Sequence, residues 1–326
     1  MTCLKLESDG INQPEMETSC PWWEKYPGLM HYTTGAGLTG IVSTDCLWAI
    51  RAIFLNDTTE MTHFFDARLI DFIRPAIRKY LEEMKIMNSS LEKHVEKEIE
   101  KFRSATLEFN DYYVFSMCRA GDAYVEHNGL LSQWRGYGVD GGYSIVFEES
   151  ELKRRINGIR AGIEDVYYCG IDSVAQPSTN YINKIEKCLI VEIEDYIKNN
   201  KSEVLYDSIS TLSIFYKHRG FYEEREVRVV VSPEMRNSTK TTGIGSEEKS
   251  QKLIKTFLRG GMPVPYMELF CQPDKLKDRI ALPITKVIVG PHRDAEIRVK
   301  AVKQLLIENN YNDVNVVRSE IPYIGR

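Results

Sequence analysis

Short apolar runs bounded by polar or turn-forming residues recur along the chain and predict β-strands. The clearest run is FYEEREVRVVV at residues 221–231. Side chains alternate between the two faces of a strand, so every second valine of this run would share one face. Glu224, Glu226 and Arg228 would share the opposite face. Further strands are expected over residues 29–34, 46–57, 111–120, 142–149, 187–194, 284–290 and 314–319.

Helical spacing dominates other parts of the chain. Residues 35–45 follow the first strand with apolar positions at helical intervals, and residues 295–309 form a similar segment between the last two strands. Over residues 61–109 apolar side chains recur every three or four positions, and Pro75 predicts a kink within that run. Runs of strands with helices inserted between them indicate an α+β fold.

The domain organisation follows from these elements. Residues 1–27 are polar and acidic and are expected to form an N-terminal arm. Residues 28–326 are expected to form a single α+β domain, with a helical pair inserted at about residues 61–109. The stretch over residues 235–251 is rich in Gly, Ser and Thr and predicts a mobile loop.

Composition and charge narrow the class of protein. The net charge of −5 and the pI near 5.8 argue against non-specific nucleic-acid binding through a broadly basic surface, although a small basic patch is compatible with them. Seven cysteines without a CxxC pair predict reduced thiols, and no metal site is expected. No apolar run is long enough for a membrane span, and the N-terminus has no signal-peptide layout. A cytoplasmic location without membrane association is therefore expected.

Glu224 and Glu226 are the first candidates for chemistry. Residues two apart on a strand are separated by about 6.5–7 Å. Poorly solvated carboxylates at that distance raise the pKa of at least one of them, and Arg228 on the same face could offset the repulsion. A carboxylate beside a cleft can stabilise the electron-poor sugar carbon that forms when a glycosidic bond breaks. The alternative is a solvated strand face on which charges alternate in sign.

The motif HYTT contributes three candidate ligand-binding residues. His31 could bond a ribose hydroxyl, Tyr32 could stack on a base or nicotinamide ring, and Thr33 adds a hydroxyl. The alternative for His31 is a half-buried imidazole whose hydrogen bond goes to the backbone. In the motif FLNDTTE, Asn56 either holds a loop over a ligand or begins an ordinary turn.

The motif SQWRGYG combines aromatic rings with a guanidinium group. Trp134 and Tyr137 could sandwich a base, while Arg135 reaches a phosphate. The alternatives are core packing for Trp134 and an ordinary surface position for Arg135.

Taken together, these motifs resemble a bacterial family known as domain of unknown function 2971. The resemblance rests on the order and spacing of HYTT, FLNDTTE, SQWRGYG, GYSIVFE, EREVR and ITKVIVGP, and it extends from about residue 29 to the end. The family name implies no activity.

The chain is also similar in organisation to ADP-ribosyltransferases, which carry a ribose-binding His on an early strand and a catalytic Glu on a late strand. The resemblance implies a mixed, split β-sheet core. It implies that His31 binds ribose, that Glu226 is catalytic, and that Glu224 completes a Glu-x-Glu pair. The second strand, LWAIRAIF, departs from the family because it lacks the tyrosine of one subgroup and the Ser-Thr-Ser element of another. Trp48, Arg51 or Tyr137 is a candidate replacement.

This second resemblance implies an enzyme that cleaves the nicotinamide–ribose bond of NAD, its substrate, and transfers ADP-ribose to a protein or nucleic acid. It further implies a toxin or antiviral defence effector with an antitoxin or partner subunit. The implied roles are transition-state stabilisation by Glu226, acceptor activation by Glu224, ribose binding by His31, packing on nicotinamide by Tyr32 or Tyr137, and pyrophosphate binding by Arg51 or Arg135. The alternatives are an NAD glycohydrolase and a non-catalytic nucleotide-binding or sensing module.

Overall fold

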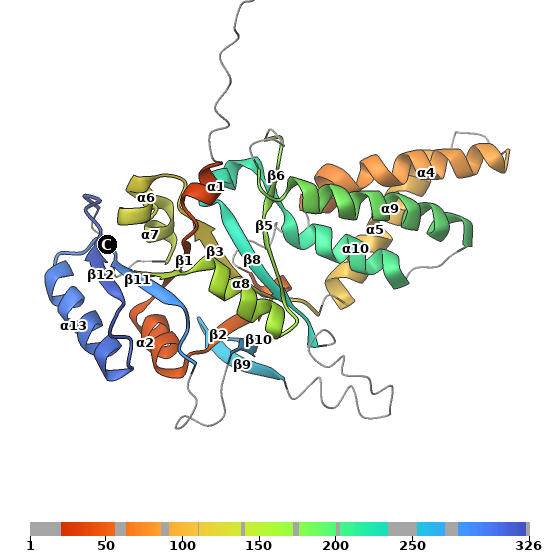
Figure 1. The fold of residues 1–326 in the computed structure, drawn as a ribbon. Coiled ribbons are helices and arrows are strands. Elements are labelled where there is room, and N and C mark those ends of the chain that lie inside the picture. Colours follow the sequence, from red (N-terminus) through yellow and green to blue (C-terminus); the bar gives the residue numbers. More distant parts are fainter. Residues whose placement is uncertain are drawn as a thin grey trace, which may run out of the picture.

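The fold is a mixed α+β arrangement in which helices pack around a large β-sheet (Figure 1). The computed structural model describes residues 21–55, 63–85, 91–109, 111–137, 141–171, 176–199, 203–233, 253–270 and 280–323. Most of the expected N-terminal arm, Asn56 and the expected loop over residues 235–251 lie outside the described residues. The α+β fold class is confirmed.

Within the described ranges, ten strands form one mixed sheet. Its main path runs β12-β11-β4-β1-β3-β2-β10-β9, and β8 and β5 continue from the other edge of β3. The strands are β1 (Leu29–Thr33), β2 (Leu47–Arg51), β3 (Tyr113–Arg119), β4 (Tyr143–Phe147), β5 (Gly162–Asp165), β8 (Glu226–Val231), β9 (Ile254–Arg259), β10 (Met262–Leu269), β11 (Ile284–Val289) and β12 (Asn315–Arg318). The last two strands are parallel, while the other pairs in this sheet are antiparallel.

Helices cover the sheet on both faces and extend to one side of it. They are α1 (Trp22–Lys25), α2 (Gly35–Thr44), α4 (Ile70–Glu83), α5 (Leu91–Phe109), α6 (Ala123–Asn128), α7 (Leu131–Tyr137), α8 (Glu149–Gly158), α9 (Thr179–Asn199), α10 (Glu203–Phe215) and α13 (Ala295–Glu308). A π-helical turn (Phe65–Leu69) precedes α4, and 3-10 turns follow β2 (Ala52–Phe54) and β7 (Arg219–Glu224). The short strands β6 (Tyr167–Cys169) and β7 (Tyr216–His218) pair with each other in parallel.

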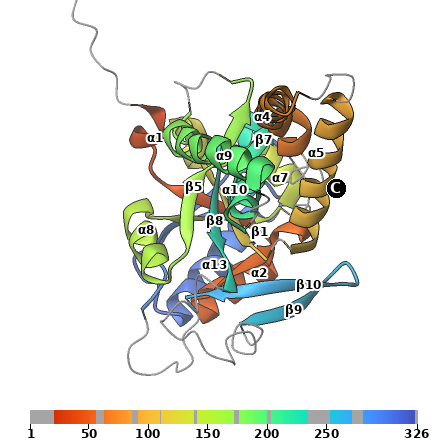
Figure 2. The ribbon, with the colours of Figure 1, turned by 90° about the vertical axis from the view of Figure 1, so that its right-hand side faces the viewer.

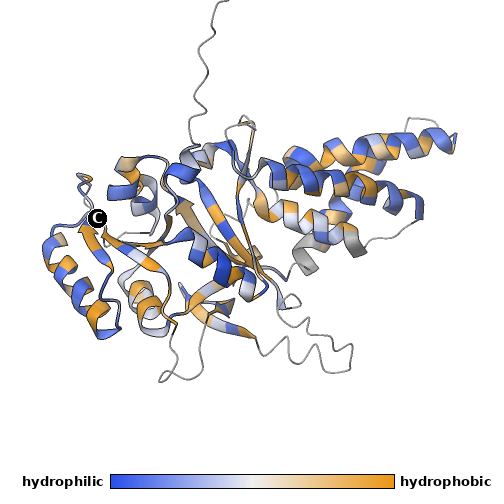
Figure 3. Ribbon diagram, in the orientation of Figure 1, coloured by the Kyte–Doolittle hydropathy of each residue, from blue (hydrophilic) through white to orange (hydrophobic). Residues whose placement is uncertain are grey.

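The main core lies between one face of the sheet and the helices α2, α8 and α13. Val227, Val229 and Val231 of β8 point into it and are fully buried, as their alternation predicts. Figure 3 shows the central strands as largely hydrophobic ribbons, whereas the surrounding helices alternate between hydrophobic and hydrophilic positions. The hydrophobic side of each helix packs on the sheet, and burial of this apolar surface is the main force that holds the helices in place.

A second core joins α4, α5, α9 and α10 into a helical layer beside the sheet (Figures 1 and 2). The predicted helical region supplies α4 and α5, and the helix α4 runs through Pro75 without ending there. The strand predicted over residues 187–194 is wrong, because this segment lies inside α9. Ile182, Leu189 and Ile193 are buried at helical spacing, and this longer pattern outweighs the short apolar run CLIV.

The sheet is split beside β3. Along one edge, β3 pairs with β8 from Tyr113 to Cys118. Along the other edge, the registered pairs with β1 lie at Cys118 and Arg119, and those with β2 lie at Tyr113 and Val114. Within the described residues, positions 115–117 have no strand partner on that second edge. The divergence of β1 and β2 therefore opens a gap beside the middle of β3.

Candidate active site

A cavity of about 890 Å³ lies at this gap. Its walls come from β1, β2 and β3, from α7, and from the segment around the start of β8. Pockets of this volume are typical of small-molecule and cofactor sites. The cavity brings together six residues that the sequence singles out, namely His31, Tyr32, Trp48, Tyr137, Glu224 and Glu226.

His31 bridges the gap in the sheet. Its Nδ1 lies 2.9 Å from the carbonyl oxygen of Ser116, and its ring lies over Phe115 with 4.4 Å between the ring centroids. A carbonyl oxygen only accepts, so Nδ1 carries the proton and Nε2 carries the lone pair of the neutral ring. The imidazole thus satisfies a backbone carbonyl on the edge of β3 that has no strand partner at this point. This contact matches the alternative of an imidazole that is hydrogen-bonded to the backbone.

The imidazole of His31 is neutral at physiological pH. Burial lowers its pKa, the hydrogen bond to Ser116 only partly offsets that effect, and the pKa falls to about 4. Because His31 also lines the cavity, its neutral ring is suited to accept a hydrogen bond from a ligand hydroxyl at Nε2. The backbone-bonded interpretation and the ligand-binding interpretation are therefore compatible, since they use different nitrogen atoms.

Glu226 lies in a buried ion network. Its Oε1 accepts from Arg228 Nε at 2.8 Å, and its Oε2 accepts from Arg228 Nη2 and from Lys217 Nζ at 2.9 Å each. Lys217 Nζ also donates to Glu224 Oε2 at 2.7 Å. The alternative of a solvated strand face is wrong, because Glu226 is 6% exposed and Arg228 is 1% exposed.

This network keeps the Glu226 carboxylate charged. Burial acts to raise its pKa, but the charges and hydrogen bonds of Arg228 and Lys217 outweigh burial and lower the pKa to about 2. The carboxylate is therefore an anion at physiological pH, and two cations compensate its charge. Removing either cation would leave this buried carboxylate with one compensating cation in place of two.

The two glutamates do not share a strand face. The 3-10 turn Arg219–Glu224 contains Glu224, and Arg225 adopts a left-handed conformation with φ 44° before β8 begins at Glu226. The shared contact with Lys217 brings the two carboxylates together, rather than the strand spacing that the sequence suggests. Lys217 itself is missed by sequence reasoning, because an isolated lysine in IFYKHRG carries no signal that it is buried.

Tyr32 and Trp134 fix the position of helix α7. The backbone N–H of Leu130 donates to Tyr32 Oη at 2.7 Å, and the rings of Tyr32 and Trp134 meet edge to face at 4.8 Å. Trp134 is 1% exposed, and its Nε1 donates to the carbonyl of Asn128 at 3.0 Å. Trp134 therefore packs in the core, while Tyr32 and Tyr137 line the cavity.

Several predicted ligand-binding residues do not line the cavity. Arg51 lies 3.9 Å from Asp111 in an ion pair, and Arg135 lies over the ring of Tyr323 at 5.6 Å. Thr33 at the end of β1 and Trp134 are also absent from its walls. Asn56 lies outside the described residues.

Three further residues complete the cavity wall, and one of them, Trp48, is a candidate from the sequence. Arg259 of β9 lines the cavity, and its guanidinium also contacts the carbonyl of Phe54. Trp48 of β2 lines it as well, with 44% of its surface exposed and its ring stacked on Tyr266 at 4.3 Å. Gln133 of α7 is a further wall residue. Only tertiary structure brings Arg259 next to β2, so the sequence carries no local signal for it.

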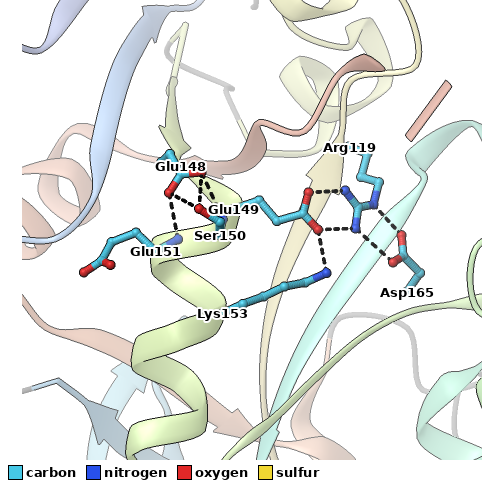
Figure 4. A network of polar contacts seen from close by, with 7 residues as sticks. All are labelled: Arg119, Glu148, Glu149, Ser150, Glu151, Lys153 and Asp165. Atoms are coloured by element: carbon cyan, nitrogen blue, oxygen red, sulfur yellow. Dashed lines mark hydrogen bonds and ion pairs between the residues drawn. The ribbon is translucent and has the colours of Figure 1, made fainter. Parts of the chain in front are cut away.

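A second ion network stabilises the sheet away from the cavity (Figure 4). Arg119 at the end of β3 lies between Glu149 of α8 and Asp165 of β5, with hydrogen bonds of 2.6–3.0 Å. Lys153 reaches Glu149 from the next turn of α8 at 2.7 Å. These carboxylates do not line the cavity, so this network offers a matched control for the one around Glu226.

Comparison with known protein families gives a match over part of the chain. Residues 133–229 match the model of a family described as protein of unknown function (DUF2971). The matched region contains α7 from Gln133 onward, together with Lys217, Glu224 and Glu226, but not β1 or β2. No curated protein and no solved structure matches the chain. In the part of the chain that the structure describes, no helix has the length and apolar character needed to cross a bilayer.

Proposed function

We propose that this chain is an ADP-ribosyltransferase-like enzyme that cleaves the nicotinamide–ribose bond of NAD in the cavity beside β3. The observation that carries the proposal is the convergence of His31 from β1 and Glu226 from β8 on one cavity. These residues are far apart in the sequence, and nothing in the local pattern of either strand requires them to meet. The volume of about 890 Å³ is large enough for a nucleotide ligand.

The proposed reaction breaks the bond between the ribose C1′ and the nicotinamide nitrogen, and the bonding electron pair leaves with nicotinamide. The resulting sugar carbon carries oxocarbenium character, which a fixed anion stabilises. Glu226 supplies that anion, and the acceptor then attacks C1′. Glu224 takes the proton that the attacking oxygen or nitrogen releases.

The environment of Glu226 supports this role in one respect. A charged carboxylate has about four acceptor sites, and three hydrogen bonds from Lys217 and Arg228 occupy three of them. The remaining site can accept from a ribose hydroxyl while the two cations hold the carboxylate rigid. Electrostatic stabilisation is strongest when the charged group is already fixed before the reaction.

The remaining contacts follow from the cavity wall. His31 accepts from a second ribose hydroxyl at Nε2, and Tyr137 packs on the nicotinamide ring. Tyr32 is the weaker candidate for that packing role, since it is 5% exposed and its hydroxyl already bonds Leu130. Arg259 binds the pyrophosphate in place of Arg51 or Arg135, because it is the one of these three that lines the cavity.

A non-catalytic nucleotide-binding module is the second candidate. The observation that favours it is the close engagement of Glu226 by two cations, which reduces the net negative charge that a developing sugar cation would experience. In such a module the network would hold the cavity in shape, and NAD would bind without being consumed.

The experiment that tests the proposal is incubation of the protein with NAD labelled in the adenylate part, in the presence of a cell extract. Label on a macromolecule supports the transferase, and free ADP-ribose supports the alternative of an NAD glycohydrolase. Bound but unchanged NAD supports the binding module. The acceptor, the toxin or defence role and an antitoxin partner stay predictions.

A further inference from the structure

The wall of the cavity formed by α7 contains polar groups without partners. Gln133 is 6% exposed, and its carboxamide makes no hydrogen bond to any residue that the structure describes. Beside it, the Oγ of Ser132 is enclosed and likewise has no hydrogen-bond partner. Buried polar groups in proteins are almost always hydrogen-bonded, so the enclosed hydroxyl of Ser132 is an exception. Together with the carboxamide of Gln133 beside it in the cavity wall, it indicates a site for a ligand.

These groups lie on one face of the helix. Ser132, Gln133, Gly136 and Tyr137 all line the cavity, and on a helix they fall within an arc of about 140°. Trp134, which follows Gln133, points instead into the core and holds the helix in place. The carboxamide is thus presented by a rigid element, next to the aromatic ring of Tyr137.

We infer that Gln133, assisted by Ser132, recognises a primary carboxamide on an aromatic ring. A glutamine side chain offers one acceptor oxygen and an NH₂ donor side by side. A ligand carboxamide carries the same pair in reverse, so the two groups form paired hydrogen bonds. A ligand carboxylate has no hydrogen to donate, and it would place an oxygen against the Gln133 oxygen. This inference rests on the proposed function, in which the ring is nicotinamide.

This inference is tested by measuring whether the protein binds an aromatic carboxamide more tightly than the corresponding carboxylate. Isothermal titration of the full chain with nicotinamide and with nicotinate uses probes that the proposed reaction cannot consume. We expect the protein to bind nicotinamide at least about tenfold more tightly than nicotinate. Gln133→Met should bring the ratio of the two affinities, nicotinamide to nicotinate, close to one. Methionine has a side chain of similar length but offers no amide.

Two further variants make the test specific. Gln133→Glu keeps the size and should raise the ratio above that of the unmodified protein, since a carboxylate accepts from the amide NH₂ and repels nicotinate. Gln304→Met, on the exposed face of α13, is the matched control and should leave the ratio unchanged. The affinity ratio should thus fall in Gln133→Met and rise in Gln133→Glu. Opposite changes of this kind require contact between residue 133 and the probe, and a purely structural role would not produce them.

Absence of nicotinamide binding, or an unchanged ratio in Gln133→Met and Gln133→Glu, would overturn the inference. Should Gln133→Met fail to fold, an unchanged ratio in Gln133→Glu alone has the same consequence. NAD cleavage is measured separately on the same samples. Amide discrimination without cleavage would overturn the proposed enzyme and leave a binding subsite, whereas cleavage without discrimination would overturn only the role of Gln133.

Discussion

His31 and Ser116 are joined across the gap in the sheet by a hydrogen bond from Nδ1 to the carbonyl oxygen, at 2.9 Å. This contact fixes the tautomer of the imidazole and directs its lone pair away from β3. One side chain thereby serves the fold with one nitrogen and the cavity with the other. The first prediction follows from the protonation of this ring.

The stability of the protein should decrease as the pH falls from 6.5 towards 4. The pKa of His31 is lowered from 6.5 to about 4 in the folded chain, so over this window the unfolded chain holds a proton that the folded chain lacks. The free energy of unfolding therefore falls with decreasing pH, by up to about 3 kcal/mol from this residue. Urea denaturation at several pH values measures the free energy of unfolding. The slope of this free energy against pH should be smaller in His31→Gln.

The comparison is His94→Gln, which makes the same substitution at an exposed position of α5. The slope should fall further in His31→Gln than in this variant. An identical pH dependence in His31→Gln would contradict the buried, neutral state assigned to His31.

Replacement of Lys217 by Met should destabilise the protein by about 2–4 kcal/mol, because it leaves Glu224 and Glu226 with one fewer buried cation. The pKa of Glu226 should also rise from about 2, since Lys217 is one of the two cations that lower it. The comparison is Lys153→Met, which removes an ammonium at the same 2.7 Å distance from a glutamate but at a side chain that is 43% exposed. That loss should cost about 0–1 kcal/mol. Equal costs in chemical denaturation would show that the Lys217 network is not buried as described.

Gly136 offers a way to fill the cavity without disturbing the protein. A Cβ atom at this position would meet no atom within 4 Å, although Gly136 lines the cavity. Gly136→Ala should stabilise α7 by up to about 1 kcal/mol, and Gly136→Leu should retain stability while occupying ligand space. We expect NAD affinity to fall about tenfold or more in the leucine variant, measured by titration calorimetry.

Gly40 supplies the comparison for this prediction. It lies inside α2, and its Cβ would also meet no atom within 4 Å, but it does not line the cavity. Gly40→Leu should therefore leave NAD affinity unchanged. Equal affinity in both leucine variants would place the ligand elsewhere.

Much of the fold follows from local patterns. The alternation around Val227, Val229 and Val231 predicts a strand with one face in the core, and the structure confirms it. The strand–helix–strand order of the last segment is also confirmed in β11, α13 and β12. These predictions succeed because alternation and helical spacing each reflect burial against a single neighbouring layer.

The errors arise because short windows of sequence omit the residues that decide burial, whether these lie in a distant segment or just beyond the window. The face of β8 that carries Glu226 and Arg228 reads as solvated, yet Ile214, Tyr168 and Lys217 contact it. Similarly, the apolar run CLIV reads as a strand until its neighbours in α9 extend the pattern to helical spacing. Short windows of sequence do not reveal which distant segment covers a polar face.

The candidate site was predictable only where a residue's chemistry can be recognised from its own local motif. His31, Tyr32 and Glu226 carry recognisable chemistry in their own motifs, and the structure brings them to one cavity. Lys217, Arg259 and the unpartnered carboxamide of Gln133 gain their significance from long-range packing. Their positions could not be derived from spacing along the chain.

The most direct test of the account is the rate of nicotinamide release from NAD by the unmodified protein, Glu226→Gln and Asp165→Asn. Both variants neutralise a carboxylate in a buried ion network, but only Glu226 lines the cavity. We predict release by the unmodified protein, a loss of about 100-fold or more in Glu226→Gln, and a rate within about twofold of the original in Asp165→Asn. No release by the folded, unmodified protein, or equal rates in all three, would contradict the proposed enzyme.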